Sequence, residues 1–141
     1  MEISFIAGFG PITRDADARD FWGGALALPL TEIAPGYWGT EGGSLAGANG
    51  FALWPLEHAA EAVFGSSAWP GDLPVPQAWV EFDVASPAAV AAAVEELRGE
   101  GQRVLTEAQD EPWGQTTARL LSPEGLLVGI TYTPWLHGEP A

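Results

Sequence analysis

The sequence contains no cysteine among its 141 residues. This absence excludes disulfide scaffolds, thiolate metal sites, iron–sulfur clusters and catalytic cysteines, and it favours a cytoplasmic location. Apolar residues make up 47% of the chain and charged residues 17%, so the chain has enough apolar material for one hydrophobic core. We therefore predict a single folded domain that spans residues 1–141.

Basic residues are also scarce, because the chain has five arginines and no lysine against 19 acidic residues. The net charge of −14 repels phosphate groups, so we expect binding neither to nucleic acid nor to anionic membranes. The same charge either keeps the protein in solution or attracts cationic ligands.

Long hydrophobic runs are the third absence. Residues 1–5 have no basic region, so the sequence predicts no signal peptide. No apolar run approaches the ~20 residues that a membrane-spanning helix needs. We therefore expect a soluble, cytoplasmic protein.

The second half of the chain has clear secondary-structure signals. Residues 79–84 alternate between two faces, which predicts a strand. Ser86-Pro87 predicts the start of a helix that continues to Arg98. The remaining predicted elements are a strand at 102–106 and a hairpin of 116–121 with 126–133, in which Gly125 makes the turn.

The first half gives a similar pattern. Residues 3–9 predict a strand that ends at Gly10-Pro11. A helix is expected to follow from a cap at Thr13 or Asp15 as far as Gly23. Its expected buried stripe consists of Ala18, Phe21 and Trp22. The remaining predicted elements are a strand at 28–33 and a hairpin of 44–46 with 51–55, in which Gly50 makes the turn.

Each half therefore has a predicted β-α-β-β-β order, in an α+β fold. The two modules cover about 3–55 and about 77–134, and a linker of about 56–76 holds a short helix at 57–64. We expect the two mixed sheets, each with a helix on one face, to form a curved cup. The open face of the cup must be filled by a ligand, a metal or a partner chain.

This duplicated pattern resembles the vicinal oxygen chelate superfamily, which includes glyoxalase I, bleomycin-resistance proteins and extradiol dioxygenases. The resemblance covers nearly the whole chain. Its most specific stretches are Arg19-Asp20-Phe21-Trp22, 79–84 with Ser86, Pro112-Trp113-Gly114-Gln115, and Ser122-Pro123-Glu124-Gly125. The resemblance implies the cup fold and a homodimer, but it leaves the activity open, because one fold carries several chemistries.

The resemblance also implies four metal-ligand positions, one on each of four strands. In this chain they fall at Ala7, Trp54, Trp79 and Gly129. A slip of one residue gives Gly8, Leu53, Val80 and Val128, which are also unable to bind a divalent metal. His58 and His137 lie off the predicted cup strands and are expected at the surface. We therefore expect no metal and no cofactor.

Aromatic side chains replace ligands at two of these positions, since Trp54 and Trp79 stand there. The chain has seven tryptophans, which either fill the core or line the cup. The aromatic residues expected to line the cup are Phe5, Phe9, Trp38, Trp54, Trp79 and Trp113. Ala7 and Gly129 are small and would leave a gap between the rings, which suits a planar aromatic guest.

Two carboxylates, Glu81 and Asp83, share the strand side that holds Trp79. A buried carboxylate needs a partner, and Arg119 on a neighbouring strand is the expected partner of Glu81. Glu81 forms either a structural ion pair or a contact with a cationic or hydrogen-bonding group of the ligand.

These observations predict a protein that is not an enzyme. The expected function is the binding and sequestration of a hydrophobic or aromatic small molecule, such as an antibiotic in a resistance protein. The ligand would be a planar polyketide or enediyne, which the tryptophans favour, or a cationic bleomycin-type drug, which the charge favours. The alternatives are a lyase, isomerase or dioxygenase-like enzyme of the same superfamily, and a dimeric module whose tryptophans fill its own cup.

Overall fold

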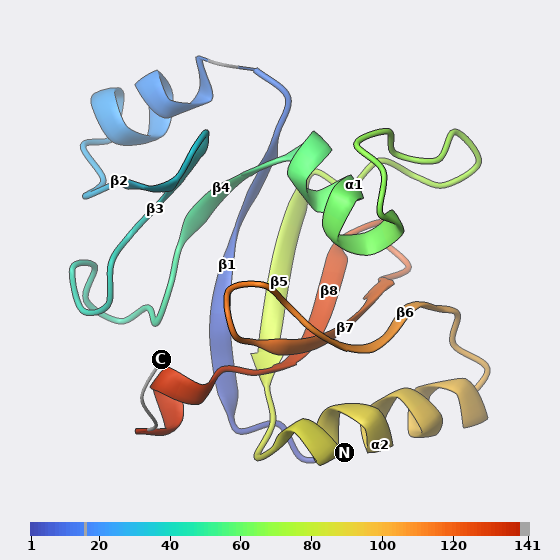
Figure 1. The fold of residues 1–141 in the computed structure, drawn as a ribbon. Helices are drawn as coiled ribbons and strands as arrows, with labels where there is room; N and C mark the ends of the chain where they lie inside the picture. The colour runs from blue at the N-terminus through green and yellow to red at the C-terminus, as the bar shows by residue number, and fades with distance from the viewer. Residues whose placement is uncertain (16, 139–141) are drawn as a thin grey trace. The chain divides into compact units, whose positions relative to one another are not determined.

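The computed structural model describes residues 1–15 and 17–138, which form an α+β protein (Figure 1). Its contacts divide the chain into two compact units. Gly8–Trp79 make up the N-terminal unit, and Met1–Ala7 together with the chain from Val80 onward make up the C-terminal unit. Among the described residues, no helix is long and apolar enough to span a membrane.

The strands of the N-terminal unit lie in the order β2-β3-β4-β1. β4 pairs in parallel with β1, where Ile12 is opposite Trp54, and antiparallel with β3, so this sheet is mixed. The elements are β1 (Phe5–Thr13), the helical turn η1 (Asp20–Ala25), β2 (Thr31–Ala34), β3 (Tyr37–Gly39), β4 (Ala52–Pro55) and the helix α1 (Leu56–Phe64). The first residues of β1 belong to the C-terminal unit.

The strands of the C-terminal unit lie in the order β5-β8-β7-β6. The elements are β5 (Ala78–Asp83), α2 (Pro87–Gly99), β6 (Val104–Asp110), β7 (Thr116–Leu121), β8 (Leu127–Tyr132) and the short helix η2 (Pro134–His137). Both halves of the chain therefore have the predicted element order, and α1 confirms the helix expected in the linker.

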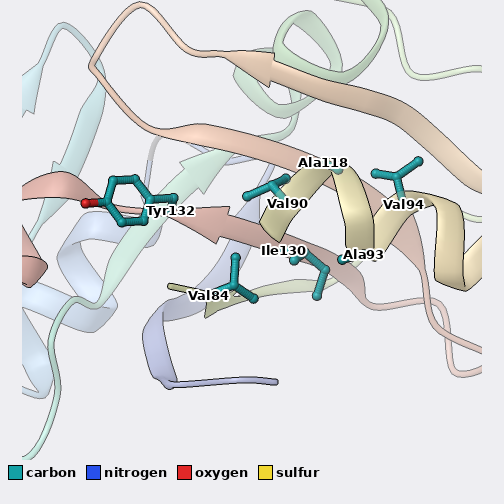
Figure 2. Packing of buried hydrophobic residues seen from close by; sticks show 7 residues of the cluster. All are labelled: Val84, Val90, Ala93, Val94, Ala118, Ile130 and Tyr132. Atoms are coloured by element: carbon teal, nitrogen blue, oxygen red, sulfur yellow. The ribbon is translucent and has the colours of Figure 1, made fainter. Parts of the chain in front are cut away.

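The helix α2 begins and packs as predicted. The Ser86 side chain accepts a hydrogen bond from the Ala89 backbone N–H at 3.1 Å, and Pro87 is the first helical residue. Val90 and Val94 are buried against the sheet (Figure 2). Their cluster consists of Val84, Val90, Ala93, Val94, Ala118, Ile130 and Tyr132. Each buried valine contributes about 1.5–3 kcal/mol to folding.

The predicted hairpin of β7 and β8 is also confirmed. The two strands pair in one continuous antiparallel register from Thr116–Tyr132 to Leu121–Leu127. Gly125 has a φ of +86° in the turn, a conformation that favours glycine.

The predicted turn at Gly10-Pro11 is wrong, because β1 runs through both residues to Thr13. A Cβ atom on Gly10 would lie 2.0 Å from the backbone oxygen of Ala52. The glycine is therefore required by the close approach of β1 to β4 and not by a turn.

The predicted first helix is also wrong in form. Residue 16 lies outside the described residues, and the described helical turn η1 has the wider π geometry, in which the Leu26 N–H bonds to the Phe21 oxygen at 3.0 Å. Phe21 is 53% exposed and does not belong to a buried stripe. Two adjacent glycines at the end of the segment weaken an α-helix, which accounts for the difference.

The predicted strand at 44–46 does not form, and the partner of β4 is β3. Residues 41–50 make turns, in which Gly43 and Gly47, rather than Gly50, have positive φ values. The glycine-rich composition of this stretch favours turns over a strand.

Candidate functional site

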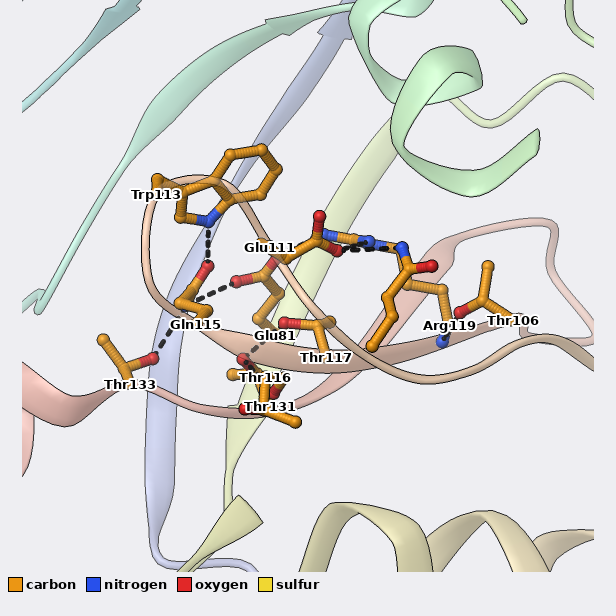
Figure 3. Close-up of polar contacts among 11 residues, drawn as sticks. Glu81, Thr106, Glu111, Trp113, Gln115, Thr116, Thr117, Arg119, Thr131 and Thr133 are labelled. Carbon is orange, nitrogen blue, oxygen red and sulfur yellow. Dashed lines mark hydrogen bonds and ion pairs between the residues drawn. The ribbon is translucent and has the colours of Figure 1, made fainter. Parts of the chain in front are cut away.

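One face of the C-terminal sheet carries a polar cluster. Ala118 and Ile130 are paired across β7 and β8 and point into the core with α2. Side chains alternate along a strand, so the neighbouring pairs Thr117–Thr131 and Arg119–Gly129 lie on the opposite face. We call the cluster on this face the polar site (Figure 3). It consists of Glu81, Glu111, Gln115, Thr117, Arg119, Thr131 and Thr133.

Arg119 lies at the centre of the polar site between two carboxylates. Its NH1 nitrogen is 2.6 Å from Glu111 Oε1, and its NH2 nitrogen is 3.6 Å from Glu81 Oε2. The expected ion pair of Glu81 with Arg119 is therefore present, but it is the longer of the two. The Glu111 contact was not expected from the sequence, although an acidic residue directly before the 112–115 motif was a usable signal.

A chain of hydrogen bonds connects the surface to Glu81. The Trp113 indole donates to Gln115 Oε1 at 2.7 Å. The Gln115 amide then donates to Thr133 Oγ1 at 2.7 Å and to Glu81 Oε1 at 3.3 Å. Trp113 itself is 49% exposed. Figure 3 shows these side chains meeting beneath the loop between β6 and β7.

Burial raises the pKa of the Glu81 carboxyl above its ordinary value. The charge of Arg119 and the hydrogen bond from Gln115 oppose this shift, whereas the negative charge of Glu111 adds to it. Glu81 is therefore a carboxyl group that accepts a proton more readily than a glutamate in water does.

Gly129 lies directly beside Glu81. A Cβ atom on Gly129 would be 2.8 Å from Glu81 Cγ and 3.5 Å from Thr117 Cγ2. The missing side chain thus makes room for Glu81, not for a gap between aromatic rings.

Trp54 and Trp79 pack against each other in the N-terminal unit. Their ring centroids are 5.9 Å apart with an edge-to-face angle of 74°, and the two residues are 9% and 7% exposed. The Trp79 indole donates to the Ala52 oxygen at 3.2 Å. This packing is typical of a core and differs from the open aromatic slot that the sequence suggested.

The other predicted site residues are divided between the units. Phe9 and Trp38 lie in the N-terminal unit, where Phe9 contacts Phe51 and Arg19 lies over the Trp38 ring. Phe5 and Ala7 lie in the C-terminal unit. Among the predicted residues, the polar site therefore contains Glu81 and Arg119. Gly129 lies beside Glu81 and Trp113 is hydrogen-bonded to Gln115, whereas the structure does not bring the other predicted residues to the site.

His137 is not the surface residue that the sequence suggested. Its Nε2 atom contacts Asp83 Oδ2, and its ring stacks on Tyr132 with centroids 4.6 Å apart. Asp83 is completely buried, and its Oδ1 atom has no hydrogen bond among the described residues.

The residues present do not fit the metal centre of the superfamily. The implied positions Ala7, Trp54, Trp79 and Gly129 offer no metal-binding oxygen or nitrogen lone pair from a side chain. Within residues 1–15 and 17–138, no group of three or more histidine, aspartate or glutamate side chains could hold a metal ion.

A cavity of about 280 Å³ lies elsewhere in the C-terminal unit, beside α2. Its walls include Met1, Ser4, Val84, Ala89 and Glu96. None of the polar-site residues lines it.

Comparison with known proteins identifies the fold. No protein-family model and no curated protein sequence matches the chain. A glyoxalase/bleomycin resistance protein/dioxygenase superfamily member from Vibrio splendidus 12B01 superposes with a TM-score of 0.56 at 14% identity, covering 94% of this chain and 100% of that one.

Two structures that are described as enzymes are also similar to this chain. A variant of Streptomyces coelicolor methylmalonyl-CoA epimerase, in complex with 2-nitronate-propionyl-CoA, has a TM-score of 0.55 at 20% identity over 94% of this chain and 99% of that one. A structure described as an NAD-dependent benzaldehyde dehydrogenase from Legionella pneumophila has a TM-score of 0.58 at 12% identity over 89% and 96%. At these identities the likeness shows the fold and not the activity. The chain has the vicinal oxygen chelate fold.

Proposed function

We propose that the protein binds an aromatic small molecule at the polar site, does not transform it, and thereby sequesters it. The molecule would be an antibiotic-like natural product, and the protein would act as a homodimer. One observation carries the proposal: hydrogen bonds run from the half-exposed Trp113 indole through Gln115 to the buried Glu81.

The two ends of this chain suit different parts of a ligand. The Trp113 ring offers a flat face for stacking, which contributes about 0.5–1.5 kcal/mol beyond the burial of area. Glu81 offers a carboxyl group that is shielded from water and therefore interacts strongly with a polar group of the ligand. Sequestration at nanomolar concentration needs about −12 kcal/mol of binding free energy, to which each of these contacts would contribute a part.

Titration of the protein fluorescence with planar aromatic and cationic antibiotics tests the proposal. We expect saturable quenching, with each ligand recovered unchanged by chromatography. An absence of binding across both classes would contradict the proposal.

The Trp113→Ala variant tests the site. Loss of the stacking surface is expected to weaken binding about tenfold by isothermal titration calorimetry, since 1.4 kcal/mol corresponds to a factor of ten. Trp69→Ala is the control, because Trp69 packs on Phe64 in the N-terminal unit. Equal effects of the two substitutions would place the ligand elsewhere.

A second candidate function is proton transfer by Glu81. The raised pKa of Glu81 favours it, because a general acid or base works best when its pKa is near the working pH. This candidate predicts that a ligand is recovered chemically altered and that Glu81→Gln abolishes the alteration while the ligand still binds.

A further inference from the structure

Two tryptophans of the C-terminal unit are half exposed. Trp113 lies on the loop between β6 and β7 and is 49% exposed, and Trp135 lies on η2 and is 42% exposed. A single exposed apolar side chain is ordinary on a protein surface, whereas neighbouring exposed aromatic side chains are typical of an interaction site.

The ring of Trp135 lies against the loop that carries Trp113. A Cβ atom on Gly114, the residue after Trp113, would be 3.6 Å from Cζ3 of Trp135, which is an ordinary van der Waals distance. Gly114 has a φ of +109°, a conformation that favours glycine. The backbone directly after Trp113 therefore contacts Trp135, so the two side chains are neighbours on the surface. We call them the indole pair.

A buried hydrogen bond joins the two segments that carry the indole pair. The Gln115 amide donates to Thr133 Oγ1 at 2.7 Å, and the Gln115 side-chain oxygen accepts the Trp113 indole N–H at 2.7 Å (Figure 3). Thr133 is the residue directly before η2. Gln115 and Thr133 are 8% and 2% exposed, so water does not compete for their bond. This bond fixes the loop with Trp113 relative to the helix with Trp135.

Both ends of η2 are held within the C-terminal unit. His137, its last residue, contacts the buried Asp83, while Thr133 before its first residue is bonded to Gln115. A surface that is ordered before binding loses less conformational entropy when the ligand arrives.

The exposed area of the indole pair fits a small molecule. A tryptophan side chain has roughly 150–250 Å² of surface, so two half-exposed ones offer roughly 200 Å². A stable interface with another protein takes about 800 Å² from each partner. A flat ligand of several fused rings is large enough to contact both indoles, whereas a single ring contacts one.

We propose that Trp135 is a second ligand-binding residue, which together with Trp113 selects planar molecules of several fused rings over single-ring molecules. Gln115 and Thr133 are positioning residues, which hold the indole pair in place. This inference rests on the proposed binding function and adds the size class of the aromatic ligand.

NMR tests the positioning role without a ligand. Thr133→Val keeps the shape of the side chain but removes the acceptor for Gln115. We expect the Trp113 indole N–H signal to shift and its hydrogen exchange to become faster. Thr106→Val is the matched control, because Thr106 Oγ1 accepts the Arg119 backbone N–H at 2.9 Å in a buried bond that does not involve Gln115. Equal changes in the two variants, or no change in Thr133→Val, would overturn the positioning role.

The same spectra test the contact within the indole pair. Trp135→Leu removes an aromatic ring whose ring current acts on Gly114. We expect the backbone signals of Gly114 to move in this variant. Unchanged Gly114 signals would show that the two tryptophans are not neighbours.

Titration of the protein fluorescence tests the size class. The probes are 1-hydroxyanthraquinone, which has three fused rings, and 2-hydroxyacetophenone, which has one ring with the same hydroxyl and carbonyl groups. We expect the native protein to prefer the three-ring probe at least tenfold and Trp135→Leu to lose most of this preference. Trp135→Phe should retain more of it. Trp69→Leu is the control and should retain all of it, because Trp69 packs on Phe64 in the N-terminal unit.

The possible outcomes separate this inference from the proposed function. Binding of the probes with no effect of Trp135→Leu would overturn the inference and leave the proposed function in place. Binding of neither probe would contradict both. A change of oligomeric state in Trp135→Leu, measured by size-exclusion chromatography with probe binding unchanged, would assign the indole pair to a second copy of the chain and overturn the inference.

Discussion

At the residue scale, the buried Glu81 makes the stability of the protein depend on pH. The pKa of Glu81 is raised in the folded protein, so the folded state binds this proton more tightly than the unfolded state does. The resulting stabilisation is complete below the ordinary glutamate value of about 4.3, and it is lost as the pH rises through the raised pKa.

Glu81→Gln removes this titration because its amide stays neutral. We expect the variant to gain stability relative to the native protein as the pH rises from about 4 to about 7. Urea denaturation at several pH values measures the difference, with Glu107→Gln as an exposed comparison. A difference that shrinks with rising pH would contradict the assignment.

The sequence predicted the position of some site residues but not the contacts of others. The alternation along β5 correctly placed Glu81 on the face opposite Phe82, next to Arg119. The contact of Glu111 with Arg119 depends on the closure of the β6–β7 loop, and the position of Glu111 directly before the 112–115 motif was its only signal in the sequence. The burial of Trp54 against Trp79 could not be predicted from the sequence either, because a large apolar residue can belong to a core or to a binding surface.

At the scale of elements, local signals predicted best where they agreed with each other. The helix α2 has a capping serine, a proline at its first position and a regular apolar stripe, and its bounds were nearly correct. β1 was predicted too short, because the close approach of Gly10 to Ala52 on β4 is a contact between distant parts of the sequence.

His137 on the short helix η2 contacts the buried Asp83 with its side chain. His137→Phe keeps an aromatic ring over Tyr132 but removes the hydrogen-bonding nitrogen. We expect a loss of about 1–3 kcal/mol in the free energy of unfolding, because the Asp83 carboxylate would stay buried without a partner. Urea denaturation measures this loss. His58→Phe, on α1 of the other unit, is the comparison and should cost less.

At the scale of the whole molecule, the dominant property is the net charge of −14. This charge attracts cations over a distance that salt shortens, from about 10 Å at 0.1 M to about 3 Å at 1 M. We expect the association rate of a cationic aromatic ligand, measured by stopped-flow fluorescence, to fall steeply between these salt concentrations. A neutral derivative of the same ligand should be nearly insensitive to salt. Equal salt dependence of the two ligands would show that the charge does not guide binding.

The first seven residues belong to the C-terminal unit, and this affects when that unit can fold during synthesis. Residues 1–7 belong with the chain from Val80 onward, where the Ser4 N–H bonds to the Asp83 oxygen at 2.8 Å and Phe5 contacts His137. The C-terminal unit thus consists of two segments that are separated in the sequence by the whole N-terminal unit. During synthesis, residues 1–7 therefore leave the ribosome before Asp83 and His137 do, and they cannot make these contacts until both residues have followed.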